Sequence, residues 1–343
     1  MVSLSDVAER AGVSPSTVRR AIREPGLVSP ATLERVLEVV AALGYEPNET
    51  AGALRRGRNR TIGLIVGDIL GFFFASLTRA VGRATRSAGF SLLIADNEYR
   101  ADVELADLRA FNSHRVSGLI LRSAYGSGNY EYLQRMAERG TAIVEIDYFH
   151  PHSPFHHVML DNAGATAEGV RYLRTLGHER IAGIGLQESI DHPDERTDGF
   201  VSAAGMAGLS LPDAWNPKVA RTGAATAEEH AYQATRRAML LAPRPTAIFA
   251  LTGASAIGAL RALQDLRLVI PDDVSLLSFD HDRWTTVVTP PLDVLEQPID
   301  EMGRTAVGIV LDALDRPSRE SVRCRYQARL VMRGSCGAPA ELR

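Results

Sequence analysis

Three arginines stand close together in the segment GVSPSTVRRAIREPG, residues 12–26, which also holds two prolines. A guanidinium fork can donate two hydrogen bonds to the edge of a guanine, and it can also bind the phosphates of a nucleic acid. A third interpretation is an ordinary basic helix surface in contact with solvent. The local pattern leaves all three open, so the elements that position Arg19, Arg20 and Arg23 must decide.

Signals for three short helices surround these arginines. Ser3 and Asp6 form a capping-box-like start, and Gly12 suits the left-handed end of a helix. Ser14 and Ser29 each precede a proline, which is the pattern of an N-cap followed by the first helical residue. Two short helices joined by a glycine-containing turn are typical of a helix-turn-helix. The inward face of the second helix would consist of Val18, Ala21 and Ile22.

The distribution of charge fits a local anionic partner. The net charge is −3, yet the first sixty residues carry nine arginines and seven acidic residues. A small basic end on an acidic body favours nucleic-acid binding by that end alone. The two cysteines, an N-terminus without an apolar core and the lack of any apolar run of membrane-spanning length predict a cytoplasmic protein with no membrane partner.

From residue 61 the pattern changes to alternating strands and helices. Short, nearly continuous apolar runs are separated by amphipathic segments, which is typical of buried parallel strands with crossover helices. The runs are TIGLIVGDI, FSLLIADN, VSGLILRS, TAIVEID, HVMLDN, RIAGIGLQ, PTAIFALTG and VSLLSFD. They fall into two sets, in residues 61–159 and 160–287, so we expect two lobes.

Polar residues follow these runs at the predicted carboxyl ends of the strands. Ligands of open parallel sheets collect at this edge, so two lobes facing each other are expected to enclose a small-molecule site. The residues placed there are Asp68, Asp96, Asn97, Arg122, Ser123, Asp147, Gln187, Thr252 and Asp280.

The sequence holds no motif for catalysis. GIGLQE lacks a complete dinucleotide-binding fingerprint, and neither a P-loop nor a G-x-S-x-G occurs. The histidines of FHPHSPFHH, residues 149–157, belong either to a metal site or to a solvated loop, and the two prolines favour the loop. We therefore expect no enzyme, no metal and no cofactor, only a small-molecule effector.

The segment LSDVAERAGVSPSTVRRAIREPGLVSPATLERVLEVVAALGYEPN, residues 4–48, resembles the N-terminal module of the Lac/Gal repressor family. The family pattern is D-V-A-x-x-A-G-V-S-x-x-T-V-S-R, followed by V-S-x-x-T and L-G-Y-x-P-N. The resemblance implies sequence-specific DNA binding by the second helix of the helix-turn-helix.

The resemblance assigns roles within that helix by position. Pro15, Ser16 and Arg20 occupy base-reading positions, whereas Ser14 and Thr17 occupy phosphate positions. This chain departs from the family at Arg19, where a serine is usual, and the extra cation strengthens phosphate contact or extends the base footprint. Arg23 lies at the helix end, where a phosphate contact is expected.

The next segment, NETAGALRRGRNR in residues 48–60, lies where the family has a hinge helix that folds on DNA. The resemblance implies DNA contacts by Asn48, by Leu54 as a minor-groove wedge, and by Arg55. Composition alone favours a flexible basic linker, and Gly52 weakens a helix by up to about 1 kcal/mol relative to alanine. Gly52 and Ala53 also depart from the residues usual in the family.

The resemblance continues through RTIGLIVGD, LGHERIAGIG, RTDGF, PDDVSLLSFD and EMGRTA. It implies a two-lobe periplasmic-binding-protein-like core of parallel sheets that dimerises and binds an effector, often a sugar or nucleobase, between its lobes. The expected boundaries are a helix-turn-helix domain at 1–46, a hinge at 47–60 and a core at 61–343, with an N-lobe of 61–159 and 288–319 and a C-lobe of 160–287 and 320–343.

Effector contacts follow from the same resemblance. The implied residues are Phe73, Phe74, Asp147, Arg196, Thr252 and Asp280. Arg196 is alternatively part of an interlobe salt bridge, and Asp147 is alternatively a helix cap. Thr252 and Gly253 replace the asparagine and aspartate usual in the family.

The sequence thus predicts an all-α helix-turn-helix module followed by an α/β core. The expected function is that of a homodimeric transcriptional regulator, in this family most often a repressor, controlled by a sugar or sugar derivative. Its two-fold symmetry would be matched by a pseudo-palindromic operator. The alternatives are a solute-binding protein, an enzyme on a doubly wound fold, and a regulator that responds to another class of effector.

The hinge assignment can be tested with Leu54→Ala. If Leu54 wedges into the minor groove, the variant lowers operator affinity but leaves effector binding intact, because the wedge contacts DNA alone. Gel shifts measure the first and ligand titration the second. Unchanged operator affinity would remove the wedge hypothesis.

Overall fold

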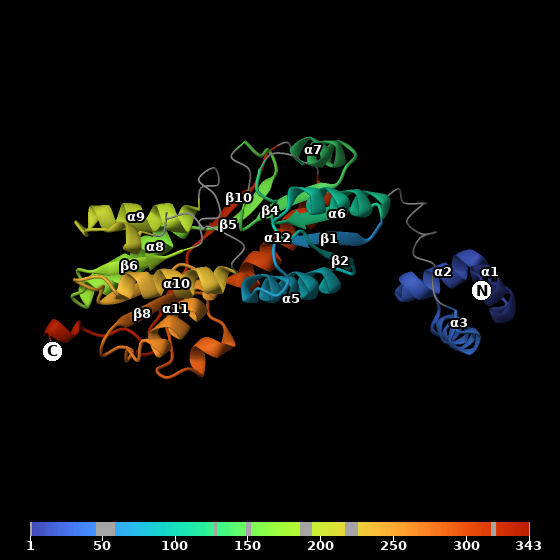
Figure 1. The fold of residues 1–343 in the computed structure, drawn as a ribbon. Coiled ribbons are helices and arrows are strands. Elements are labelled where there is room, and N and C mark those ends of the chain that lie inside the picture. The colour runs from blue at the N-terminus through green and yellow to red at the C-terminus, as the bar shows by residue number, and fades with distance from the viewer. Residues whose placement is uncertain are drawn as a thin grey trace. The chain divides into compact units, whose positions relative to one another are not determined.

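A computed structural model describes residues 2–45, 59–126, 129–148, 152–185, 194–216, 226–316 and 320–342 (Figure 1). The chain divides into two compact units, a first unit of Met1–Asn59 and a second unit of Arg60–Arg343. Each unit has hydrophobic clusters of its own.

The first unit has the predicted caps at the ends of its helices. Ser3, Ser14 and Ser29 each accept a hydrogen bond from the backbone N–H three residues ahead, and the following helix starts there. Gly12 and Gly44 end two of the helices at φ 62° and 58°. In residues 2–45 the elements are α1 (Leu4–Ala11), α2 (Pro15–Arg23), η1 (Pro25–Leu27) and α3 (Pro30–Leu43).

A small apolar core holds these helices together. Val7 of α1, Val18 of α2 and Val36 of α3 are fully buried against one another. Burial of each such side chain contributes about 1.5–3 kcal/mol, which stabilises helices that are too short to persist alone. Because Val18 and Ala21 face inward, the opposite face of α2 is turned to solvent.

The second unit is built on two sheets. The first sheet has the order β10-β5-β4-β3-β1-β2 and the second sheet the order β11-β9-β8-β7-β6. The described strand pairs are parallel except for β11 with β9. The first sheet comprises β1 (Thr61–Val66), β2 (Ser91–Asp96), β3 (Gly118–Leu121), β4 (Ala142–Ile146), β5 (His156–Leu160) and β10 (Arg323–Tyr326). The second comprises β6 (Ile181–Ile184), β7 (Ala247–Ala250), β8 (Ser275–Phe279), β9 (Asp293–Glu296) and β11 (Arg329–Val331).

Helices cover both faces of each sheet (Figure 1). On the first sheet, α5 and α12 pack against one face while α6 and α7 pack against the other. On the second sheet, α8 and α9 share one cluster while α10 and α11 share another. The helices are α5 (Phe72–Ser87), α6 (Ala101–Ser113), α7 (Tyr130–Glu138), α8 (Asn162–Thr175), α9 (Glu195–Met206), α10 (Ala227–Met239), α11 (Gly253–Asp265) and α12 (Ile299–Asp315). The predicted order of an α-helical module and a doubly wound α/β core is confirmed.

The sheets differ from the predicted lobe boundaries in two places. Residues 288–319 were expected in the first lobe, but β9 lies within the second sheet, paired with β8 and β11. Residues 320–343 were expected in the second lobe, but β10 pairs with β5 in the first sheet. The chain therefore crosses between the sheets after β5, after β9 and after β10. Within residues 288–319, α12 packs against the first sheet as expected. The strand β10 was not predicted because its residues alternate between exposed and half-buried, so no continuous apolar run marks it.

Asp293, the first residue of β9, joins the end of the chain to the second sheet. Its carboxylate is fully buried and accepts a hydrogen bond from the Tyr172 hydroxyl at 2.7 Å. The other carboxylate oxygen accepts from the backbone N–H groups of Arg333, Gly334 and Ser335 at 2.6, 2.7 and 3.2 Å. These bonds satisfy backbone groups that would otherwise be buried without a partner.

Asp293→Ala should therefore lower the free energy of unfolding by roughly 2–4 kcal/mol, because several buried donors lose their acceptor. Urea denaturation monitored by circular dichroism measures this change. The matched control is Asp265→Ala, which removes a tyrosine–aspartate hydrogen bond of the same 2.7 Å length, to Tyr232, from the exposed surface. We expect a change within about 0.5 kcal/mol for this control. Equal losses in the two variants would contradict the assignment.

Candidate DNA-binding helix and effector-binding residues

Helix α2 presents the predicted DNA-binding residues on one side of the first unit. Pro15, Ser16 and Arg20 are exposed, whereas Thr17 and Arg19 are half-buried. Val18, which lies among them in the sequence, and Ala21, which follows Arg20, are buried. The helical period therefore separates a polar, basic face from the apolar core of the unit.

The N-terminus of α2 gathers three hydroxyl groups. The Ser14 hydroxyl lies 2.7 Å from that of Ser16 and 2.8 Å from that of Thr17, and it accepts from the Thr17 backbone N–H. Hydroxyls and N–H groups at a helix N-terminus are suited to binding phosphate oxygens. The role of Ser14 and Thr17 in phosphate binding stays a prediction that this arrangement fits.

The arginines of α2 carry the positive charge of this face. Within residues 2–45, neither Arg19 nor Arg20 forms an ion pair. Arg23 is the last residue of α2, and its side chain lies outside the described part of the structure. The hinge residues Asn48, Leu54 and Arg55 also lie outside the described residues, so their DNA contacts stay predictions.

In the second unit, the carboxyl edge of the first sheet brings Asp147 together with Arg122, which was expected at this edge but not among the effector contacts. Asp147 follows β4 with a left-handed backbone, φ 67°, and Arg122 follows β3. The Arg122 Nε lies 3.7 Å from the Asp147 Oδ2. Burial raises the pKa of Asp147, although Arg122 and Arg196 lower it.

The edge of the second sheet has a corresponding pair. Arg196, in the first turn of α9, lies 4.0 Å from the Oδ2 of Asp280, which follows β8 at φ 71°. The Arg196 guanidinium donates to the Asn162 side chain at 2.8 Å and to the Leu251 carbonyl at 3.1 Å. Gln297 donates to the other Asp280 oxygen at 2.6 Å. Each side chain is 12% exposed, so both retain some access to solvent.

The remaining predicted effector residues have structural partners. Thr252 is the N-cap of α11, since its hydroxyl accepts from the Ser255 N–H at 3.0 Å. Phe73 and Phe74 lie in the first turn of α5 and are less than a tenth exposed, within the core of the first sheet. Their rings contact edge to face at 5.0 Å. Effector contact by these residues stays a prediction, and the two phenylalanines are less accessible than the Arg196–Asp280 pair.

Three tyrosines surround Arg122. None of these four residues is among the expected effector contacts, although Arg122 was expected at this edge of the sheet. The guanidinium carbon lies 4.7, 4.2 and 4.8 Å from the ring centroids of Tyr99, Tyr125 and Tyr148. We call these rings the tyrosine cage. The available signal was an arginine directly after a buried strand, at the edge where ligands collect.

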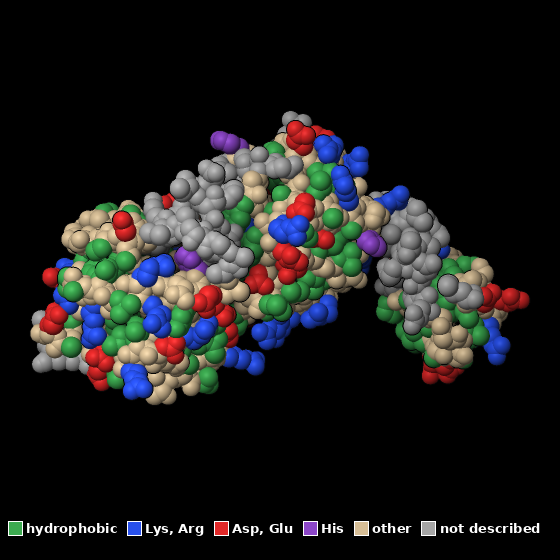
Figure 2. Space-filling model, in the orientation of Figure 1, with side chains coloured by type: hydrophobic (Ala, Val, Ile, Leu, Met, Phe, Trp, Pro, Cys, Tyr) green, Lys and Arg blue, Asp and Glu red, His purple; other side chains and the backbone are tan. Residues whose placement is uncertain are grey.

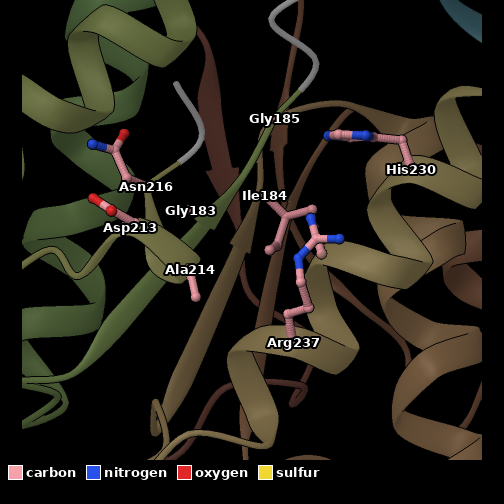
Figure 3. A pocket seen from close by; sticks show the side chains of 9 residues that line it. Gly183, Ile184, Gly185, Asp213, Ala214, Asn216, His230 and Arg237 are labelled. Atoms are coloured by element: carbon pink, nitrogen blue, oxygen red, sulfur yellow. The ribbon is translucent and has the colours of Figure 1, made fainter. Parts of the chain in front are cut away.

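A cavity of about 260 Å³ lies elsewhere in the second unit, between β6, η2 (Asp213–Trp215) and α10 (Figure 3). Asp213 and Asn216 lie on one side of β6, and His230 and Arg237 lie on the other. None of the predicted effector residues lines it. The cavity therefore differs in place from the two arginine–aspartate pairs.

The expectation of a solvated loop for the histidine segment is wrong at its end, because His156 and His157 belong to β5 and His157 is buried. The His156 Nδ1 accepts from the Val322 N–H at 3.0 Å, while the His157 Nε2 lies 3.3 Å from the Glu145 carboxylate. His150 lies outside the described residues. In the described part of the chain, no cluster of three histidine, cysteine or acidic side chains is arranged to hold a metal ion.

The surface gives no sign of a membrane segment. Among the described helices, none combines the length and the apolar character that crossing a bilayer requires. On the visible face in Figure 2, acidic and basic side chains of the second unit are interspersed with apolar ones. Both cysteines, Cys324 and Cys336, are free thiols.

A capped three-helix module with a basic outward helix, followed by two doubly wound sheets, defines a DNA-binding regulator with a periplasmic-binding-protein-like core. Residues 3–48 match the bacterial regulatory proteins of the lacI family, and residues 170–336 match the periplasmic binding protein-like domain. The chain belongs to the LacI family of transcriptional regulators.

Relatives match over nearly the whole length of the chain. The HTH-type transcriptional regulator PtxS of Pseudomonas aeruginosa is 31% identical over 97% of this chain and 95% of its own. The transcriptional regulator CelR in complex with cellobiose is 27% identical, with a TM-score of 0.70 over 98% of this chain and all of its own. The Lac repressor dimer bound to operator and the anti-inducer ONPF shares the fold, with a TM-score of 0.84 at 24% identity over 98% and 99% of the two chains.

The arginines of α2 can be distinguished by substitution. Arg20→Ala should cost about 1–3 kcal/mol and relax base preference at one operator position, because a bidentate base contact is lost. Arg19→Ala should weaken binding to all sequences alike and reduce the salt slope by about 1, because a phosphate contact is lost. Binding to a library of operator variants measures both effects.

Arg35→Ala serves as the control, because it removes an exposed arginine from α3 rather than from α2. We expect it to change neither base preference nor overall affinity beyond the effect of one distant charge. If Arg20→Ala weakens every operator variant to the same extent, the base-reading assignment is wrong.

Proposed function

We propose that this chain is a transcriptional repressor that binds a specific operator through α2 and is controlled by a small-molecule effector. The observation that carries the proposal is the outward face of α2, where exposed Ser16 and Arg20 adjoin the hydroxyl cluster at the helix start. Side chains of this kind on a helix-turn-helix can read base edges while the N-terminus of the helix binds phosphates.

The effector site of this proposal lies at the carboxyl edges of the two sheets. Arg122 with Asp147 and Arg196 with Asp280 supply donors and acceptors in alternation, which suits the hydroxyl groups of a sugar. The cellobiose complex of CelR supports an effector of the sugar class. The side chains that bind the effector are those of Asp147, Arg196 and Asp280 in this proposal, with Phe73, Phe74 and Thr252 at its margin.

The assembly that we propose is a cytoplasmic homodimer on a pseudo-palindromic operator. Two copies of the first unit then contact two half-sites, because the symmetry of a dimer is matched by the symmetry of its DNA. The second unit binds rather than catalyses in this proposal. Effector binding shifts the dimer between two states that differ in operator affinity, which is the requirement for allosteric control.

Binding to DNA upstream of the chain's own gene tests the proposal. The full chain should form a specific complex, and the slope of log K against log salt should be steeper than about −4, because a dimer that neutralises five or more phosphates releases their counterions. Fluorescence anisotropy at several salt concentrations measures the slope. The control is a scrambled duplex of the same length.

The competing solute-binding function makes the opposite prediction. A solute-binding protein gives equal, weak affinity for the promoter and the scrambled duplex, with sugar binding intact. That result would exclude the regulator.

A further inference from the structure

The strongest unexplained feature of the second unit is the burial of Arg122. Only 5% of its side chain is exposed, and the Nε has no hydrogen-bond partner. A desolvated guanidinium nitrogen without an acceptor is unfavourable and requires an explanation, such as a ligand that supplies the missing oxygen.

The surroundings of Arg122 combine aromatic rings with one ion pair, to Asp147. Two rings of the tyrosine cage, Tyr99 and Tyr125, stack at 6.0 Å, and the Tyr125 side chain also forms a hydrogen bond with the guanidinium. The Oδ2 of Asp147 is 3.7 Å from the Nε, which is too long for a hydrogen bond. The Nη1 donates to the Ser123 carbonyl at 2.8 Å. The Nε is therefore the guanidinium nitrogen that is buried without an acceptor.

A buried network fixes the backbone that carries Arg122. Its N–H donates to the Ile65 carbonyl at 3.0 Å, and its carbonyl accepts from the Asn97 side chain at 2.9 Å. Glu104, itself only 3% exposed, accepts from Asn97 at 3.0 Å and from the Ala124 N–H at 2.5 Å. The arginine is thus held in place before any ligand arrives, which lowers the entropic cost of binding.

Asp147 neutralises this cation only in part, because its Oδ2 lies 3.7 Å from the Nε, beyond hydrogen-bond distance. Burial raises the pKa of Asp147, although Arg122 and Arg196 lower it. Asp280, the corresponding acid of the second sheet, is engaged by Gln297 and lies beside Arg196. A ligand carboxylate would complete the site better than a hydroxyl, because hydrogen bonds between two charged groups are about twice as strong as neutral ones.

We propose that Arg122 is a specificity-determining residue that binds a carboxylate of the effector, so that the effector is a sugar acid rather than a neutral sugar. This inference rests on the effector control proposed above. Arg122 binds the carboxylate through its Nε edge, the tyrosine cage contacts the apolar faces of the sugar, and the Arg196–Asp280 pair binds hydroxyl groups at the other end.

Matched pairs of acids and neutral sugars test this assignment. Isothermal titration calorimetry of the full chain would use gluconate and glucuronate against glucose, and galacturonate against galactose. At least one acid should bind at least 10-fold more tightly than its neutral counterpart. Tighter binding of the neutral sugars, or no binding by any of the three acids, would overturn the proposal.

Substitutions locate the carboxylate. Arg122→Gln should weaken binding of the acid at least 10-fold, and Arg122→Lys should also weaken it, because lysine keeps the charge but not the Nε. The matched control is Arg109→Gln, which removes an exposed arginine from α6 in the same lobe and should leave the affinity unchanged. Equal effects of Arg122→Gln and Arg109→Gln would overturn the proposal.

Asp147→Asn provides a second test in case the Arg122 variants do not fold. Removing a carboxylate 3.7 Å from the Nε should tighten binding of the acid and weaken binding of a neutral sugar. Weaker binding of the acid would contradict the assignment. Promoter binding is measured separately, so the two proposals can fail independently. Absence of specific promoter binding by the wild-type chain refutes the proposed regulator. The calorimetry tests the role of Arg122 whether or not the promoter is bound.

Discussion

The parallel direction of the strands is the constraint on which the effector site depends. Parallel neighbours end at the same edge of a sheet, so residues far apart in the chain meet there without any contact along the sequence. Arg122 follows β3 and Asp147 follows β4, and the two strands are paired in the first sheet. The same rule places Asp280 after β8 in the second sheet, near Arg196 of α9. In both cases the aspartate turns out of its strand with a positive φ, which directs the following chain away from the sheet.

The two units place their arginines in opposite environments, exposed to solvent in the first unit and buried in the second. In the first unit, the cations of α2 project from a small apolar core and remain available to a polyanion. In the second unit, Arg122 is buried among aromatic rings and Arg196 lies over the Phe279 ring at 4.2 Å. A solvated cation binds many phosphates weakly and in a salt-dependent manner, whereas a desolvated one discriminates strongly between neighbouring groups. The difference fits a chain whose first unit binds an extended polyanion and whose second unit binds a small molecule.

Much of this architecture could be predicted from the sequence, and the exceptions have physical causes. The helix ends of the first unit were predictable because Ser14, Ser29 and Gly12 act through local hydrogen bonds and backbone conformation. Each of the apolar runs coincides with one of the strands β1 to β8. Burial on both faces imposes this continuous apolar pattern on most of them, whereas β2, at the edge of the first sheet, is only partly buried. The strand β10 was missed because its exposure alternates over four residues, and its membership of the first sheet is decided by pairing with β5 alone.

The site was predicted less completely than the fold. Residues at strand ends, including Arg122 and Asp280, could be placed at the correct edge from topology. The tyrosine cage was not predicted, although Tyr99, Tyr125 and Tyr148 follow the strands β2, β3 and β4, because the sequence does not show that the side chains of three separate loops turn toward one arginine. Phe73 and Phe74 show the reverse case: their positions match a family pattern, but the start of α5 turns them into the core. Side-chain direction at the edge of a sheet is set by packing that a single sequence does not encode locally.

The three crossings of the chain between the sheets have a consequence for folding. The first sheet is complete only when β10 has paired with β5, and the second only when β9 has paired with β8 and β11 with β9. These strands follow the other strands of their sheets along the chain, so both sheets lack an edge until residues 293–331 have been synthesised. Pairings between strands so distant in the sequence form slowly, and the incomplete sheet edges are exposed to aggregation in the meantime.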